Sequence, residues 1–129
     1  MKVLLDTTVF LWAVGEPTRL SNESWMVIGN PAHPIFVSAA SLWELSIKQQ
    51  SGQVVLPGPV EDWIPVALRT AGFATLDIMP AHALLAGKLH PHHGDPLDRM
   101  LVAQAMLEDL TLATRDPFIA RYNVRTLMA

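Results

Sequence analysis

The sequence lacks cysteine and any long uncharged apolar run, and each absence excludes a class of structure. Without cysteine there is no disulfide and no zinc site built on thiolates, which agrees with a reducing compartment. No apolar stretch approaches the roughly 20 residues that a membrane-spanning helix needs. Asp6 interrupts the apolar N-terminal run, and no small-residue cleavage site follows. We therefore expect a cytoplasmic protein with no membrane partner.

Repeats, low-complexity segments and positive charge are also scarce. The 129 residues, of which 50% are hydrophobic, are expected to form one domain, residues 1–129. The chain has 9 Lys and Arg against 12 Asp and Glu, a net charge of −3, which argues against a nucleic-acid binder that relies on a broad basic surface. That argument weakens if four of the 12 acids surround a bound cation, because 8 acids then remain against 9 bases.

What the sequence does contain is an alternation of short apolar runs and helical segments. The predicted strands are 3–5, 34–38, 73–78, 111–114 and 124–127. The predicted helices are 7–14, 20–29, 39–50, 60–71, 80–88, 95–109 and a short one that begins at Asp116. Such alternation is typical of βα units in an α/β protein, where helices cover both faces of a mostly parallel sheet.

The stretch H-P-H-H-G-D-P-L-D-R-M-L-V-A-Q-A, residues 90–105, contains a strong helix start. Asp95 suits the N-cap position, and Pro96 suits the first helical position. Asp95 and Asp98 share one face at a helix end where free N–H groups and the helix dipole favour negative charge. The pair is open to two interpretations, a capping box alone or part of an acidic site.

Acidic residues recur at the predicted junctions between strands and helices. Asp6 ends the first strand, Asp116 follows the fourth, and Glu44 lies one turn into the helix after the second. In an open parallel sheet, ligands bind beyond the carboxyl ends of the strands, where the strand order reverses. If the first and fourth strands are neighbours, these three acids and Asp98 reach one cleft, with Asp95 at its rim.

Clustered carboxylates in a cleft either take up protons or gather a cation. Because the four acids offer only oxygen ligands, Mg²⁺ or Mn²⁺ fits them better than zinc or copper. Such an ion completes its shell with water and phosphate oxygens, which favours phosphodiester hydrolysis. Two other doubly wound classes fit less well. A phosphoacceptor receiver domain needs an acidic pair and a late lysine, and a haloacid-dehalogenase-type phosphatase needs an acid where Thr8 stands.

Four short motifs follow one another along the chain: L-L-D-T-T, S-L-W-E-L, D-P-L-D-R-M-L-V-A-Q-A and L-A-T-R-D-P. Together they resemble the PIN domain family, and within it the VapC-type toxins, over a stretch from Val3 to about Leu127. The resemblance implies an α/β/α sandwich whose five-stranded sheet has the order 3-2-1-4-5. It also implies a Mg²⁺- or Mn²⁺-dependent endoribonuclease that a cognate antitoxin inhibits. A catalytically inactive PIN-like interaction module is the alternative.

The resemblance also implies roles for individual residues. The acidic quartet of the family matches Asp6, Glu44, Asp98 and Asp116. The expected metal ligands are Asp6, Asp98 and Asp116. Asp95 is then the helix cap, with an accessory role in the site. Thr7 and Thr114 place hydroxyl groups beside the site, where they either bind and orient water or serve only as β-branched and capping residues.

Several cationic and histidine side chains are candidates for RNA binding. Arg99 and Arg115 each stand beside a quartet acid and are expected to bind RNA phosphates as bidentate donors. His92 and His93 lie in the loop that follows His90. For this loop an RNA-facing edge, a second metal site, a proton shuttle and a solvated loop without chemical role all stay open.

The four tryptophans raise the question of whether the protein has an apolar surface that binds another protein. Each of Trp12, Trp25, Trp43 and Trp63 is either a core residue or part of an apolar surface left for a partner. The apolar surplus predicts a homodimer that also buries an amphipathic antitoxin segment in a groove beside the site. His33 and His82 are isolated in the sequence and are expected to be structural.

Overall fold

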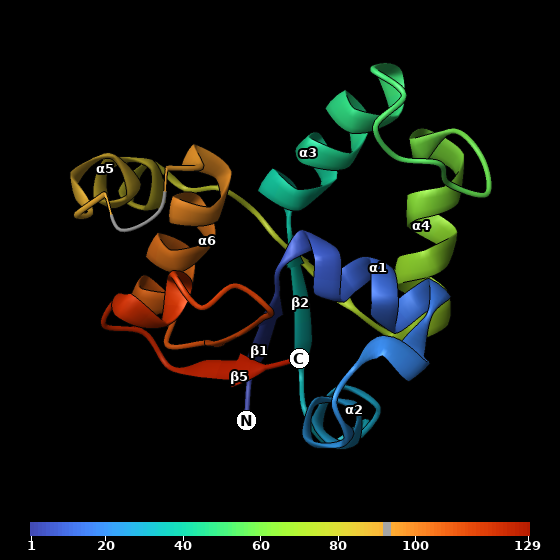
Figure 1. Ribbon diagram of the computed structural model, residues 1–129, viewed down its shortest axis with the longest axis horizontal. Coiled ribbons are helices and arrows are strands. Elements are labelled where there is room, and N and C mark those ends of the chain that lie inside the picture. The colour runs from blue at the N-terminus through green and yellow to red at the C-terminus, as the bar shows by residue number, and fades with distance from the viewer. Residues whose placement is uncertain (92–93) are drawn as a thin grey trace.

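A five-stranded sheet forms the centre of the computed structural model, which describes residues 1–91 and 94–129 (Figure 1). The strands are β1 (Val3–Leu5), β2 (Ile35–Ser38), β3 (Ala74–Leu76), β4 (Thr111–Thr114) and β5 (Thr126–Met128). Their order is β3-β2-β1-β4-β5, and each strand is parallel to its neighbours. The predicted strand order is confirmed, and the sheet is parallel throughout.

Helices cover both faces of this sheet. They are α1 (Thr7–Gly15), α2 (Asn22–Ile28), α3 (Ala39–Gln50), α4 (Val60–Ala71), α5 (Pro80–Lys88) and α6 (Pro96–Leu107), with short 3₁₀ helices η1 (Pro17–Arg19) and η2 (Ile119–Arg121). In Figure 1, α5 and α6 lie on one side of the sheet, and α1, α2 and α4 lie on the other. The molecule is therefore the three-layer α/β/α sandwich that was expected.

The strand β1 explains how the two apolar layers form. Its side chains alternate between the faces, as strand geometry requires. Val3 and Leu5 belong to the apolar cluster that contains Phe10 of α1, whereas Leu4 belongs to the cluster that contains Leu101 of α6. Because all three β1 side chains are fully buried, this strand holds the residue that follows it, Asp6, at a fixed position.

Two helix starts that bear on the site follow the expected capping chemistry. Asp6 is the N-cap of α1, and its Oδ1 accepts the Val9 N–H at 2.8 Å. Asp95 is the N-cap of α6, and its Oδ1 accepts the Leu97 N–H at 2.9 Å. A side-chain oxygen at this position satisfies an N–H group that the helix itself leaves without a partner.

Helix ends differ by one or two residues, as for the helices predicted at 20–29 and 95–109, which span Asn22–Ile28 and Pro96–Leu107. Three further predicted boundaries are wrong, and local hydrogen bonds explain why. The third strand spans 74–76 instead of 73–78, because its partner β2 pairs with it only from Phe36 to Ser38. The fifth strand spans 126–128 instead of 124–127, because the Val124 N–H bonds to Tyr122 within a turn. No helix begins at Asp116, whose Oδ1 accepts the Phe118 N–H, and only η2 follows.

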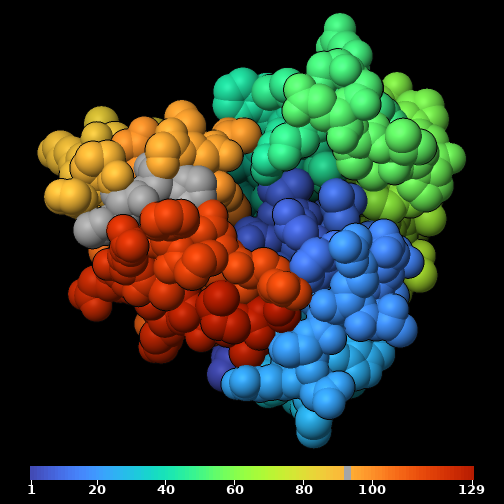
Figure 2. Space-filling view, viewed as in Figure 1, coloured from blue at the N-terminus to red at the C-terminus, as the bar shows by residue number. Residues whose placement is uncertain are grey.

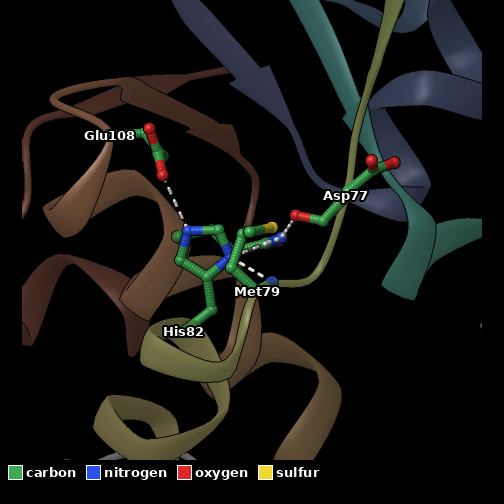
Figure 3. Close-up of polar contacts among 5 residues, drawn as sticks. Asp77, Met79, His82 and Glu108 are labelled. Atoms are coloured by element: carbon green, nitrogen blue, oxygen red, sulfur yellow. Dashed lines mark hydrogen bonds and ion pairs between the residues drawn. The ribbon is translucent and has the colours of Figure 1, made fainter.

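A buried histidine ties α5 to the end of α6 (Figure 3). His82 is 1% exposed, and its Nδ1 accepts the Met79 N–H at 2.9 Å. Its Nε2 therefore carries the proton and donates to Glu108 Oε1 at 2.9 Å. Gln104 of α6 donates to the Asp77 carbonyl at 3.2 Å beside it. The expectation that His82 is structural agrees with these contacts.

Two of the four tryptophans are exposed rather than buried in the core. Trp25 of α2 is 48% exposed and Trp43 of α3 is 61% exposed, whereas Trp12 and Trp63 are partly buried. None of the helices in the described part of the chain is long and apolar enough to cross a membrane.

Candidate active site

The carboxyl ends of β1 and β4 lie side by side, because these strands pair with Leu5 opposite Ala113. The residues that follow these two strands, together with the middle and last turn of α3 and the start of α6, surround a cleft of about 300 Å³. Figure 2 shows the surface hollowed where these segments meet. The residues that line the cleft are Asp6, Thr7, Thr8, Glu44, Lys48, Asp95, Asp98, Arg115 and Asp116. All four acids of the expected quartet therefore face one cleft, and Asp95 joins them.

Asp6 is the most deeply buried of these acids, with 7% of its surface exposed. Burial raises the pKa of its carboxyl group above the usual value, and the nearby Glu44 raises it further. The Thr114 hydroxyl and the N–H groups of Val9 and Arg115 lower the pKa of Asp6, but burial has the larger effect. A cation beside Asp6 would therefore stabilise the charged form of its carboxyl group.

Thr114 connects the two acids that follow β1 and β4. Its side chain is fully buried, and its hydroxyl bonds to the Asp6 carboxylate. Its Oγ1 also accepts the Asp116 N–H at 3.0 Å. One hydroxyl group therefore bonds both to the Asp6 side chain and to the Asp116 backbone, which fixes the positions of these two residues relative to each other. Thr114 thus contacts both acids through its hydroxyl group.

Glu44 is held at both of its carboxylate oxygens. The Thr7 hydroxyl donates to Oε1, and the Lys48 ammonium lies 2.8 Å from Oε2. Only 12% of the Glu44 side chain is exposed, so these two partners replace water at a carboxylate that is largely removed from solvent. Thr7 and Lys48 therefore hold the Glu44 carboxylate from two sides.

Asp95 and Asp98 enter the cleft from the first turn of α6. Asp95 serves as the helix cap and also lines the cleft. Asp98 lines the same cleft one turn along the helix. The amino end of α6 offsets part of the repulsion between the two carboxylates, because the helix dipole is positive there.

Of the two arginines that were expected to bind RNA, one lines the cleft and the other does not. Arg115 lines the cleft, and its guanidinium lies 5.1 Å from the centre of the Trp12 ring, over which Arg19 also lies at 4.9 Å. Such stacking orients a guanidinium while its N–H groups stay available. Arg99 is not among the residues that line the cleft. His92 and His93 lie outside the residues that the structure describes.

Sequence reasoning missed Lys48, Trp12 and Arg19. Lys48 had a signal, since a lysine four residues after Glu44 on a helix shares its face. Trp12 and Arg115 lie far apart in the sequence, and only the pairing of β1 with β4 brings them together. No spacing rule predicts that contact.

The donor set of the cleft fits a hard divalent ion. Within residues 1–91 and 94–129, no three His, Cys, Asp or Glu side chains converge closely enough to hold a metal ion by themselves. Mg²⁺ does not require three, because it is usually bound through one or two carboxylates and keeps several waters. The cleft offers carboxylate and hydroxyl oxygens around the desolvated Asp6, and this chemistry suits Mg²⁺ or Mn²⁺.

Comparison with known proteins gives consistent results. Residues 3–124 match the PIN domain family. Ribonuclease VapC22 of Mycobacterium tuberculosis is 33% identical over 115 residues, which cover 88% of this chain and 86% of that protein. In the structure of VapBC2 from Rickettsia felis bound to a promoter DNA fragment, one chain is similar with a TM-score of 0.71 and 15% identity, and the match covers 98% of each chain. FitAcB from Neisseria gonorrhoeae gives a TM-score of 0.63 at 24% identity, covering 98% of this chain and 96% of that one. At these identities the two structures support the fold alone.

Proposed function

The chain belongs to the PIN domain family, and from this premise we propose that it is a ribonuclease, the toxin of a toxin–antitoxin pair, which hydrolyses RNA phosphodiester bonds with Mg²⁺ or Mn²⁺. The observation that carries the proposal is the single cleft lined by five carboxylates from β1, α3, α6 and the end of β4. The relative named Ribonuclease VapC22 supports the activity. The structural neighbours, which include VapBC2 from Rickettsia felis and a FitAB structure bound to a DNA fragment, are in keeping with an antitoxin partner.

In this proposal the residues of the cleft have distinct roles. Of the three expected metal ligands, Asp6 and either Asp98 or Asp116 bind the divalent ion directly, the third acts through a bound water, and Asp95 adds negative charge at the rim. A divalent ion held by these residues would supply a Lewis acid for the attacking water and for the charge that builds on the phosphate. Thr114 keeps Asp6 and Asp116 in register, and Thr7 holds Glu44 in place.

RNA binding falls to the cations beside the acids. Arg115 presents its guanidinium to the phosphates while Trp12 limits its rotation. Arg99 and the histidines His92 and His93 stay predictions from the sequence, to be tested by substitution. RNA rather than DNA is the proposed substrate because of the relative's name.

The antitoxin and a second copy of the chain are the proposed protein partners. Exposed Trp43 and Ile47 share one face of α3 and are the sequence neighbours of Glu44 and Lys48, which line the cleft. An amphipathic antitoxin segment that covers these two side chains would also approach the acids, which links its binding to inhibition.

The activity is tested with purified protein, free of antitoxin, on a pool of total RNA. We expect cleavage that requires Mg²⁺ or Mn²⁺ and stops with EDTA. The substitutions Asp98→Asn and Asp116→Asn should each lower the rate by about 100-fold or more, since even a group one shell away from a metal contributes 10–100-fold.

Circular dichroism and thermal melting check that these variants fold. If the variants cleave as fast as the wild type, a contaminating nuclease is responsible. If pure wild-type protein cleaves no RNA under any of these conditions, the chain is instead an inactive interaction module of the PIN family.

A further inference from the structure

Lys48 is a cation placed inside an acidic cleft. It lies on α3 one turn after Glu44, and its Nζ is 2.8 Å from Glu44 Oε2. Because the Thr7 hydroxyl engages the other oxygen, Glu44 is a carboxylate with both oxygens already in use. Such a group is better suited to hold a neighbouring side chain in position than to bind a further cation.

The surroundings of Lys48 keep it charged and accessible. The hydrogen bond to Glu44 raises the pKa of Lys48, and the charges of Glu44, Asp95 and Asp98 add to this effect against partial burial. Its side chain remains 42% exposed. An ammonium has three N–H donors, and the bond to Glu44 uses one of them.

The charge of the cleft explains why an ammonium is needed there. Five carboxylates line the cleft, and the cations among its lining residues in the described part of the chain are Lys48 and Arg115. A divalent ion offsets two of these charges, so an RNA phosphate still meets a negative surface. Each cation that can contact the phosphate therefore has a large effect on whether RNA enters the cleft.

We propose that Lys48 is a substrate-binding residue of this cleft, whose ammonium contacts a phosphate oxygen of the bound RNA while Glu44 serves as its positioning residue. The inference rests on the proposed ribonuclease function, and it assigns a role that is separate from metal binding. A purely structural pair is the alternative, since Glu and Lys at this helical spacing also occur as surface salt bridges of small effect.

Equilibrium binding of a fluorescent single-stranded RNA separates these roles. The measurement uses the Asp116→Asn protein, in which the RNA should stay intact, with and without Lys48→Met. We expect the second substitution to weaken binding by about 10-fold, as for the loss of a hydrogen bond to a charged group. The dependence of log Kd on log salt concentration should become shallower by about 0.7, which is the value for one phosphate contact on a single strand.

Two control variants make the result specific. Lys2→Met removes the same charge outside the cleft and should leave both the affinity and the salt dependence nearly unchanged. Lys48→Arg keeps a cation and should restore a large part of the affinity. Calorimetric titration with Mn²⁺, on proteins that keep Asp116, should show binding at least as tight in Lys48→Met as in the wild type, because a competing positive charge is gone.

Unchanged RNA affinity and salt dependence in Lys48→Met would overturn the proposal, as would weaker Mn²⁺ binding in that variant, which would make Lys48 a support for the metal ligands. These outcomes can be told apart from a failure of the ribonuclease proposal. That proposal is judged by cleavage, whereas the role of Lys48 is judged by binding.

Discussion

Asp6 shows how a single residue can link the stability of this fold to its activity. Its carboxyl group is buried at the end of β1, and burial raises its pKa because the charged form loses its hydration. A carboxyl group whose pKa is higher in the folded than in the unfolded protein stabilises the fold only while it is protonated. The ionised Asp6 therefore destabilises the protein at neutral pH until a cation binds beside it.

The substitution Asp6→Asn removes this charge and keeps an oxygen that can accept the Val9 N–H. In EDTA at pH 7 we expect a higher melting temperature than in the wild type. The difference should shrink as the pH falls through the folded pKa of Asp6, because the wild-type side chain then becomes neutral as well. Thermal melting followed by circular dichroism across pH 4–8, on the order of one unit per step, measures this.

Asp77→Asn is the matched control, since it removes an exposed acid from the β3 side of the sheet. It should leave the melting temperature nearly unchanged at every pH. If Asp6→Asn melts at or below the temperature of the wild type at pH 7, the buried charge of Asp6 does not destabilise the fold.

At the same scale, the acids were predictable and their partners were not. Asp6, Asp98 and Asp116 stand at junctions that hydrophobic periodicity and capping chemistry reveal. The contact of Thr7 with Glu44 depends on how α1 packs beside α3, and the spacing of residues along the chain does not predict such packing. The same holds for Thr114, whose hydroxyl reaches Asp6 only because β1 and β4 are neighbours.

Among the elements, α5 and α6 form a pair that a buried histidine joins. His82 links the first turn of α5 to Glu108 at the far end of α6, and Figure 3 shows its ring between Glu108 and Met79. The helix α5 has no side-chain cap from Met79 itself, so His82 supplies an acceptor for one of its free N–H groups.

Replacing His82 with alanine removes this acceptor and leaves a buried space. We expect the free energy of unfolding to fall by about 2 kcal/mol or more, which combines an unsatisfied N–H group with lost packing. Urea denaturation measures the change. Glu108→Gln keeps an oxygen for the histidine N–H on a half-exposed side chain and should cost less than about 1 kcal/mol. An equal loss in both variants would contradict the role given to the Met79 bond.

Most helices and strands could be predicted from the sequence, and the errors in their boundaries have a common cause. Strand and helix positions followed from apolar runs, caps and glycines, such as Gly72, which ends α4 in the left-handed conformation with φ of 75°. The wrong boundaries lie at β3, β5 and Asp116, where the extent of pairing with a neighbour or a local turn decides the outcome. These are tertiary effects that local patterns do not report.

On the scale of the whole molecule, the fold places negative charge at one edge and leaves apolar side chains exposed elsewhere. Trp25 and Met26 of α2 and Trp43 of α3 are among the large exposed apolar residues. Such surfaces in a small protein favour association with a partner. The strand order was available from the family resemblance, whereas the division of tryptophans between core and surface emerged only from the packing.

We therefore predict a homodimer in the absence of antitoxin. Light scattering coupled to size-exclusion chromatography at micromolar concentration should give about twice the 14.2 kDa of one chain. A mass of one chain throughout that concentration range would contradict the dimer and leave the exposed apolar side chains for the antitoxin alone.

The central claim is that carboxylates from distant parts of the chain share one divalent ion. Anomalous diffraction from a crystal soaked in Mn²⁺ tests it most directly. We expect a manganese peak in the cleft, in contact with the carboxylate of Asp6 and that of Asp98 or Asp116. A well-occupied peak elsewhere on the protein, with none in this cleft, would contradict the claim.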